Sequence, residues 1–358
     1  MTRPVPKPPP ITSDSPIAPD SDSLASEGGD DRLADTQSLS ASITDYPTHW
    51  GRRYHRYREG SYPFPNDESE AERLDSQHDI FTSYFDGRLF FAPVDPDTCL
   101  RVLDIGTGTG IWPIELAESG KLPNAQVTGI DLSAIQPNMV PENVTFEIQD
   151  CSDSDWCRPP GQLDFVHARM MGGSLESYKN LIRTSRRYLR PGEGWLELHE
   201  VHPTPQCDDG TMPRDWKFAE WEDKLHYASK RKLDPPRPVR VAQHLQHWME
   251  ECGFVDVSQL VFKIPLGPWP KDKKLKGIGA EYGANWMEGL PGFSYKLFGA
   301  EGLGWSRNEI ELGLVEVRKS LAMRDVHAYL RYYVVLGRRP SEEEERELLE
   351  RRRRGEED

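Results

Sequence analysis

We expect an α/β fold with a doubly wound, mostly parallel sheet of seven strands, an N-terminal helical lid and helical insertions. Three observations predict it. A buried strand over residues 100–105 runs directly into Gly106, Gly108 and Gly110. A helical pattern starts at once with Ile111. Apolar runs and helical segments then alternate along the chain, which is typical of parallel sheets.

The glycine turn indicates the kind of ligand. Its pattern is D-x-G-x-G-x-G, with Asp104 two residues before the first glycine. A carboxylate at that point would repel a pyrophosphate, and it suits a cationic ligand such as the amino group of S-adenosylmethionine (SAM). Asp131 ends the next strand, about twenty residues on, where an acid can accept hydrogen bonds from ribose hydroxyls. The alternative is a glycine-rich turn in an ordinary α/β protein.

Ligands of such sheets lie beyond the carboxyl ends of the strands. Asp150 follows the third strand and is expected to meet the adenine amino group, although a turn or helix cap would explain it as well. The expected cofactor-binding residues are Asp104, Gly106, Thr107, Gly108, Gly110, Asp131, Leu132, Asp150 and Tyr54.

The other elements follow from hydrophobic periodicity. Strands are expected over 127–131, 144–148, 163–169, 195–201, 257–264 and 326–336, with an antiparallel pairing at or near the sheet edge open to the last. Helices are expected over 67–85, 175–189, 241–252, 271–288 and 307–323. Residues 203–238 interrupt the alternation, and we interpret them as a helical insertion that could cover the substrate side.

Composition divides the chain of 358 residues into three parts. Residues 1–48 are rich in Pro, Ser and Asp and predict a disordered tail, with a partner-binding or phosphorylated arm as the alternative. Residues 49–338 form the expected catalytic domain. Residues 339–358 form a charged tail, in which Glu–Arg pairs at i,i+4 could support a solvated helix.

Charge and cysteine usage exclude several functions. The net charge of −15 argues against nucleic-acid binding, which needs basic surface. Five cysteines at scattered spacings suggest reduced thiols, and we expect no metal site. No apolar run has transmembrane length, so no membrane association is expected. We therefore expect a cytoplasmic protein.

Residues 51–58 and the helix over 67–85 are expected to form a lid over the cofactor. The helix has an apolar side in Leu74, Phe81 and Phe85, which must be buried against something. Arg52 or Arg53 could offset the acids at the strand tips. The alternative is that the helix packs outside the sheet.

Methyl transfer needs alignment of nucleophile, methyl and sulfur, and a hydroxyl or ammonium acceptor also needs a base. His202, just past a strand, and His167 are the candidate catalytic residues. His199 fits a core histidine better, and Arg169 is expected to pair with an internal acid.

The chain resembles the fungal LaeA-like class I SAM-dependent methyltransferases over roughly residues 50–340. The resemblance is carried by Asp104-Ile-Gly-Thr-Gly-Thr-Gly-Ile-Trp112, Gly129-Ile-Asp-Leu-Ser-Ala-Ile-Gln-Pro137 and Phe165-Val-His-Ala-Arg-Met170. It implies a class I fold, SAM as cofactor, and one of two functions. One is an enzyme that methylates a small molecule in secondary metabolism. The other is a regulator of that metabolism, nuclear and acting through protein partners, with weak or self-directed activity.

Overall fold

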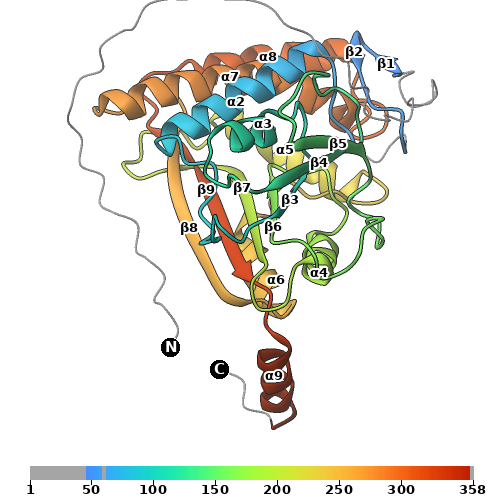
Figure 1. The fold of residues 1–358 in the computed structure, drawn as a ribbon. Coiled ribbons are helices and arrows are strands. Elements are labelled where there is room, and N and C mark those ends of the chain that lie inside the picture. Colours follow the sequence, from blue (N-terminus) through green and yellow to red (C-terminus); the bar gives the residue numbers. More distant parts are fainter. Residues whose placement is uncertain (1–45, 59–61, 355–358) are drawn as a thin grey trace, which may run out of the picture. The chain divides into compact units, whose positions relative to one another are not determined.

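The computed structural model describes residues 46–58 and 62–354. Its centre is a sheet of seven strands in the order β5-β4-β3-β6-β7-β9-β8 (Figure 1). The first five strands of the chain in this sheet run parallel, and β9 is antiparallel to both β7 and β8. The strands are β3 (Arg101–Ile105), β4 (Gln126–Asp131), β5 (Val144–Ile148), β6 (Phe165–Arg169), β7 (Trp195–Cys207), β8 (Val255–Pro265) and β9 (Ala328–Arg338).

The predicted doubly wound sheet is therefore confirmed, and the final strand is antiparallel as expected. It lies one place inside the edge, which β8 occupies. A small antiparallel pair, β1 (Thr48–His49) and β2 (Arg52–Arg53), precedes the first helix. The helices are α2 (Glu68–Tyr84), α3 (Ile111–Glu118), α4 (Tyr178–Tyr188), α5 (Lys217–Arg231), η1 (Ala242–His244), α6 (Leu245–Glu251), α7 (Lys273–Phe298), α8 (Arg307–Leu321) and α9 (Glu342–Arg354).

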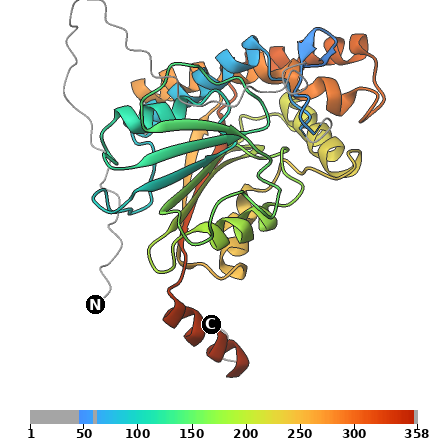
Figure 2. The same cartoon turned by 45° about the vertical axis from the view of Figure 1, so that its right-hand side comes forward.

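The sheet is buried on both faces because neighbouring residues of each parallel strand point to opposite sides. Val102 belongs to one hydrophobic core, which includes Trp112 of α3. Leu103 belongs to the other, with Ile182 of α4 and Leu245 of α6. Figure 2 shows α4 and α6 together on one side of the sheet. This two-sided burial explains the almost continuous apolar runs in the sequence.

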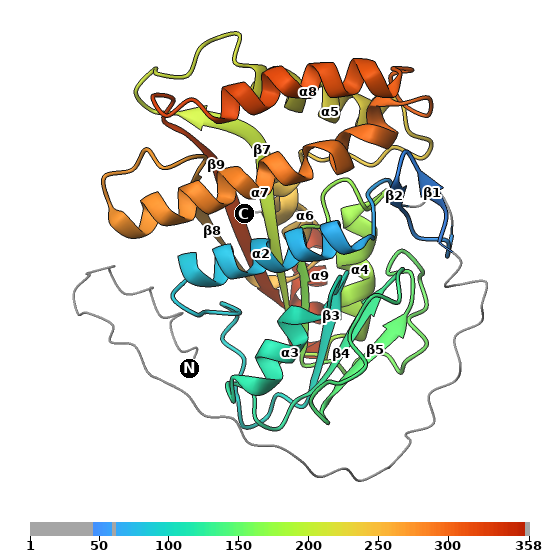
Figure 3. The same cartoon turned by 90° about the horizontal axis from the view of Figure 1, so that it is seen from above.

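Helix α2 crosses the end of the sheet at which the parallel strands finish. Seen from above, it lies between α3 and α7 (Figure 3). Its N-cap is Asp67, whose carboxylate accepts a hydrogen bond from the Glu70 amide at 3.1 Å. The same carboxylate binds Arg52 through two hydrogen bonds of 2.6 and 2.8 Å. The sequence therefore starts the helix at a polar cap and fixes it to β2.

Two expectations about the elements need correction. The helix expected over 271–288 continues to Phe298 and contains Pro291, because its buried side keeps packing along α2 and α8. The expected insertion at 203–238 begins as strand, since β7 pairs with β9 as far as Cys207 across an irregularity at 202–206. Its helical part is α5 alone.

The arginines expected to meet strand-tip acids bind elsewhere. Arg52 binds Asp67, and Arg53 binds the Asn66 carbonyl at 2.5 Å. Arg58 instead reaches a strand tip, where its two terminal nitrogens donate to Asp150 and Asp153, each at 2.8 Å.

Most of the expected N-terminal tail lies outside the described residues. The C-terminal segment 339–358 contains α9, and residues 355–358 lie outside the described range. The first turn of α9 is held by Arg338 on Glu344 and by Arg186 on Glu345, each at 2.8 Å. Over the part of the chain that the structure describes, no helix combines the length and apolar character needed to cross a bilayer.

Candidate functional site

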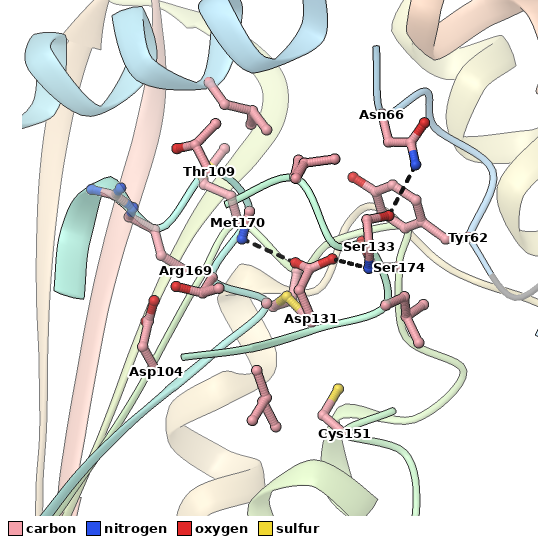
Figure 4. A pocket seen from close by; sticks show the side chains of 18 of the residues that line it. Tyr62, Asn66, Asp104, Thr109, Asp131, Ser133, Cys151, Arg169, Met170 and Ser174 are labelled. Carbon is pink, nitrogen blue, oxygen red and sulfur yellow. Dashed lines mark hydrogen bonds between the residues drawn. The ribbon is translucent and has the colours of Figure 1, made fainter. Parts of the chain in front are cut away.

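A cavity lies beyond the ends of β3, β4 and β6 and is covered by α2 (Figure 4). The glycine turn lines it with Gly106, Thr107 and Gly108, and the strand tips with Asp104, Asp131, Leu132 and Asp150. From above it is lined by Tyr62, Pro65, Asn66, Glu70, Ala71, Leu74 and Gln77. The predicted lid helix therefore forms a wall of this cavity.

The glycine turn is held in the left-handed region of φ, which favours glycine. Gly106, Gly108 and Gly110 have φ values of 68°, 58° and 82°. Gly110 does not line the cavity: a Cβ there would lie 2.4 Å from Cζ of Phe146, so this glycine is needed for packing. The other two bring backbone close to the cavity.

Asp131 is fixed by backbone donors. Oδ2 accepts from the Gly108 amide at 3.0 Å and Oδ1 from the Ser133 amide at 2.9 Å (Figure 4). Burial raises the pKa of this carboxyl to about 6. A carboxylate has about four acceptor sites, so two remain for a ligand's hydroxyl groups.

Asp104 lies at the floor of the cavity, and its side chain is buried. Burial raises its pKa to about 7. Its Oδ1 lies 2.7 Å from Nδ1 of His167. The ring of His167 stacks on Trp112 at 3.9 Å, and burial holds its pKa well below the usual value. A neutral His167 thus donates to Asp104 and orients it.

Arg169 lines the same end of the cavity. Its Nη2 donates to Nδ1 of His78 at 2.8 Å, and His78 Nε2 lies 2.8 Å from Glu115. Burial, with Arg169 nearby, lowers the His78 pKa to about 3, so this histidine is neutral. Arg169 therefore hydrogen-bonds to a histidine, and not to the internal acid expected. Asp104 and Arg169 together offer opposite charges, which matches an amino-acid zwitterion.

Asp150 is placed in the cavity lining and also has the turn-capping role, while its contact with an adenine amino group stays a prediction. Its carboxylate accepts from the Ser152 amide at 2.8 Å. Its ion pair with Arg58 fastens the segment before the lid helix to this strand tip.

Besides Gly110, two predicted site residues lie outside the cavity lining, Tyr54 and His202. Tyr54 is 1% exposed, with the Lys296 ammonium 4.3 Å from its ring centre, and Tyr62 lines the cavity in its place. His202 lies on β7 opposite Arg331 and lines neither this cavity nor the next. Burial lowers the His202 pKa to about 4.

His199 has the core role expected of it, hydrogen-bonded to Tyr332 at 2.9 Å and to Glu197 at 2.5 Å. Glu197, His199 and His167 each offer one atom that could bind a metal ion, and these three atoms lie within 4.8 Å of one another. Glu197 also accepts from the Phe91 and Ala92 amides, so hydrogen bonds already occupy its lone pairs.

A second cavity adjoins the first. The two share Tyr62, Glu70, Leu74, Gln77 and Met170 in their linings. The second is walled mainly by apolar side chains from four elements and their flanks: Phe64, Val201, Leu225, Val239, Trp286 and Phe293.

The polar groups of this second cavity include a buried ion pair and one further acid. Arg73 binds Glu70 at 2.7 Å and Asn285 at 2.9 Å. Glu200, 3% exposed, is the further acid. In the sequence it appears only as one polar residue near a strand end, without a motif.

Comparisons with known proteins now identify the family. A methyltransferase domain profile matches residues 76–259. Methyltransferase pytC of Aspergillus terreus is 41% identical over 308 residues, covering 85% of this chain and 91% of the relative. The chain is a member of the LaeA-like methyltransferase family. The secondary metabolism regulator LAE1 of Cochliobolus heterostrophus is 36% identical over 295 residues, covering 82% and 94%.

Among solved structures, phosphoethanolamine N-methyltransferase 2 of Haemonchus contortus, in complex with SAM, matches with a TM-score of 0.42 at 18% identity. That match covers 75% of this chain and 52% of the other.

The methyltransferase uses SAM, and the first cavity fits this cofactor. The carboxylate of Asp104 and the guanidinium of Arg169 line one end of the cavity, where the amino acid part of SAM would bind. Asp131 presents free lone pairs in the middle. Asp150 lies at the far strand tip, near Cys151 and Leu175.

Proposed function

We propose that this methyltransferase transfers the methyl group of SAM to a small molecule of fungal secondary metabolism. The observation that carries the proposal is the second cavity. It adjoins the first through Leu74 and Met170, and apolar side chains line most of it. An apolar cavity beside the cofactor suits a small acceptor, because small-molecule sites are concave and mostly apolar with a few polar groups.

The residues present would hold the cofactor as follows. Asp104 would bind the amino group, Arg169 the carboxylate and Asp131 the ribose. SAM, when bound, supplies an electrophilic methyl sulfonium. The chain supplies alignment, and α2 excludes water from the space between the two cavities.

A regulator that acts through protein partners is the second candidate, favoured by the 36% identity to LAE1. In that case its methyl transfer would be weak or directed at itself, and the protein would work in the nucleus. As a pathway enzyme it would be cytoplasmic. The net charge of −15 supports neither DNA nor RNA as acceptor.

Labelled SAM separates these functions. The full chain is incubated with methyl-labelled SAM and an organic extract of the source fungus from which the gene has been deleted. We expect label in one or a few small molecules. Label only in the protein itself would support the regulator, and label in added duplex DNA or RNA would contradict both proposals.

A further inference from the structure

We propose that Glu200 is the general base of the reaction and that the acceptor is a hydroxyl compound, methylated on oxygen. This inference rests on the proposed function, which it deepens by naming the acceptor group.

The geometry leaves one oxygen of Glu200 available. Oε2 accepts from the Gly172 amide at 2.9 Å and from the Tyr178 hydroxyl. Oε1 accepts from the adjacent Val201 amide at a long 3.3 Å. A Cβ at Gly172 would lie 3.1 Å from Oε1, so glycine there keeps the space beside this oxygen open. The side chain lines the second cavity, where the acceptor would lie.

The donors that hold Glu200 are neutral: the amides of Gly172, Val201 and Met171, and the phenol of Tyr178. Burial therefore dominates, and it raises the pKa of Glu200 to about 7. A base with this pKa is partly ionised at neutral pH and strong enough to take a proton from an enol or phenol.

The other titratable groups around Glu200 do not compete for this role. Tyr178 from the start of α4, Tyr282 from α7 and Tyr332 from β9 all have raised pKa values because they are buried, so they stay neutral. On α2, the carboxylate of Glu70 forms an ion pair with the guanidinium of Arg73 at 2.7 Å. Of the two acids in this lining, Glu200 is thus the one held by uncharged hydrogen-bond donors.

The step balances as follows. Glu200 takes the proton of the acceptor hydroxyl, and the oxygen lone pair forms a bond to the methyl carbon. The carbon–sulfur bond breaks, and its electron pair stays on sulfur. The products are a methyl ether, S-adenosylhomocysteine and a protonated Glu200, which returns its proton to water. A neutral amine or a thiolate would need no such base, and the rings of Phe64, Trp286 and Phe293 suit an apolar phenol or enol.

The first test concerns the product and needs no variant. Hot hydriodic acid releases volatile methyl iodide from methyl ethers, whereas N-methyl and C-methyl groups survive moderate treatment. We expect labelled methyl iodide from the small-molecule product of the extract assay. Label that stays non-volatile would overturn the hydroxyl assignment while leaving the proposed function intact. No labelled small molecule at all would overturn both.

The second test uses Glu200→Gln, which keeps the shape and an acceptor for the Gly172 amide. We expect turnover to fall about 10²- to 10⁴-fold, with SAM affinity in calorimetry unchanged within about twofold. Glu288→Gln removes an exposed carboxylate from α7 and serves as the matched control with normal turnover. Full turnover in Glu200→Gln would overturn the base assignment.

The pH profile distinguishes a base from a merely structural residue. The wild-type kcat/KM for the acceptor, measured at saturating SAM, should rise with pH through a limb near pH 7. Glu200→Asp should be slower but should retain such a limb. Tyr178→Phe removes a donor that lowers the pKa of Glu200, so its limb should move to higher pH. A limb at the same pH in Tyr178→Phe and in wild type would contradict the assignment.

Discussion

The two cavities of this methyltransferase are built in different ways. The cofactor cavity takes its floor from short consecutive stretches, the turn from Asp104 to Trp112 above all, and its acids are held largely by backbone amides. The acceptor cavity takes its walls from α2, β7, α5 and α7, and the Arg73–Glu70 ion pair on α2 is tied to α7 by the bond from Arg73 to Asn285.

This difference has a physical consequence. A backbone amide is present whatever the side chain is, so the cofactor cavity depends on the path of the strands. The acceptor cavity depends on how particular side chains pair after the helices have packed. Substitutions in the first should act mainly on SAM affinity, and those in the second on stability and on the choice of acceptor.

Arg73→Met should have the largest effect on stability. It leaves the buried Glu70 carboxylate with only the more distant Arg52, at 3.9 Å, as a cationic partner, and it removes the bond to Asn285, a loss of about 3–5 kcal/mol in the free energy of unfolding. Urea denaturation measures it. The double variant Arg73→Met with Glu70→Gln should recover much of the loss. If the single variant is as stable as wild type, the acceptor wall does not depend on this pair.

Asp131→Ala should cost about 3 kcal/mol of SAM binding, because two charge-assisted hydrogen bonds to the ribose are lost. Isothermal titration calorimetry measures the affinity. Asp97→Ala, an exposed acid near the start of β3, is the control. Unchanged affinity in a folded Asp131→Ala would remove this residue from the cofactor site.

Gly110→Ala tests the turn itself. Both the positive φ and the contact with Phe146 oppose a side chain, so we expect a loss of about 2–4 kcal/mol in unfolding free energy. Gly120→Ala shares a positive φ of 63° but has open space around its Cβ, and should lose only about 1 kcal/mol. Equal losses would show that backbone strain alone matters at Gly110.

SAM affinity should also depend on pH, and this effect should be smaller than those of the three substitutions above. Burial raises the pKa of Asp104 to about 7, and this carboxyl must be ionised before it can bind the cationic amino group of SAM. Binding should therefore tighten as pH rises from 6 to 8, by about tenfold or 1.4 kcal/mol. Asp104→Asn should bind weakly at every pH, with a flatter curve. Tighter binding at pH 6 than at pH 8 would contradict the placement of the amino group.

The sequence predicted most of the fold and the cofactor cavity for one reason. Strand, glycine turn and helix are local patterns, and parallel strands bring their carboxyl ends together. The structure accordingly brings Asp104, Asp131 and Asp150 to one cavity. Tyr54 and His202 were predicted to line the site because they are close in sequence to the lid helix and to a strand end. Which way each side chain points depended on packing that no local pattern describes.

What the sequence by itself determined is therefore the doubly wound sheet, the helix over 67–85, and the acids at the strand tips. Only the tertiary structure decided which neighbours those groups have: Arg169 on His78, Arg58 on Asp150, and Glu200 facing an apolar chamber. The reason is distance along the chain. Glu200 and Trp286 line one cavity because α5 packs against both β7 and α7. The hydrophobic burial that drives such packing carries no signature at either residue.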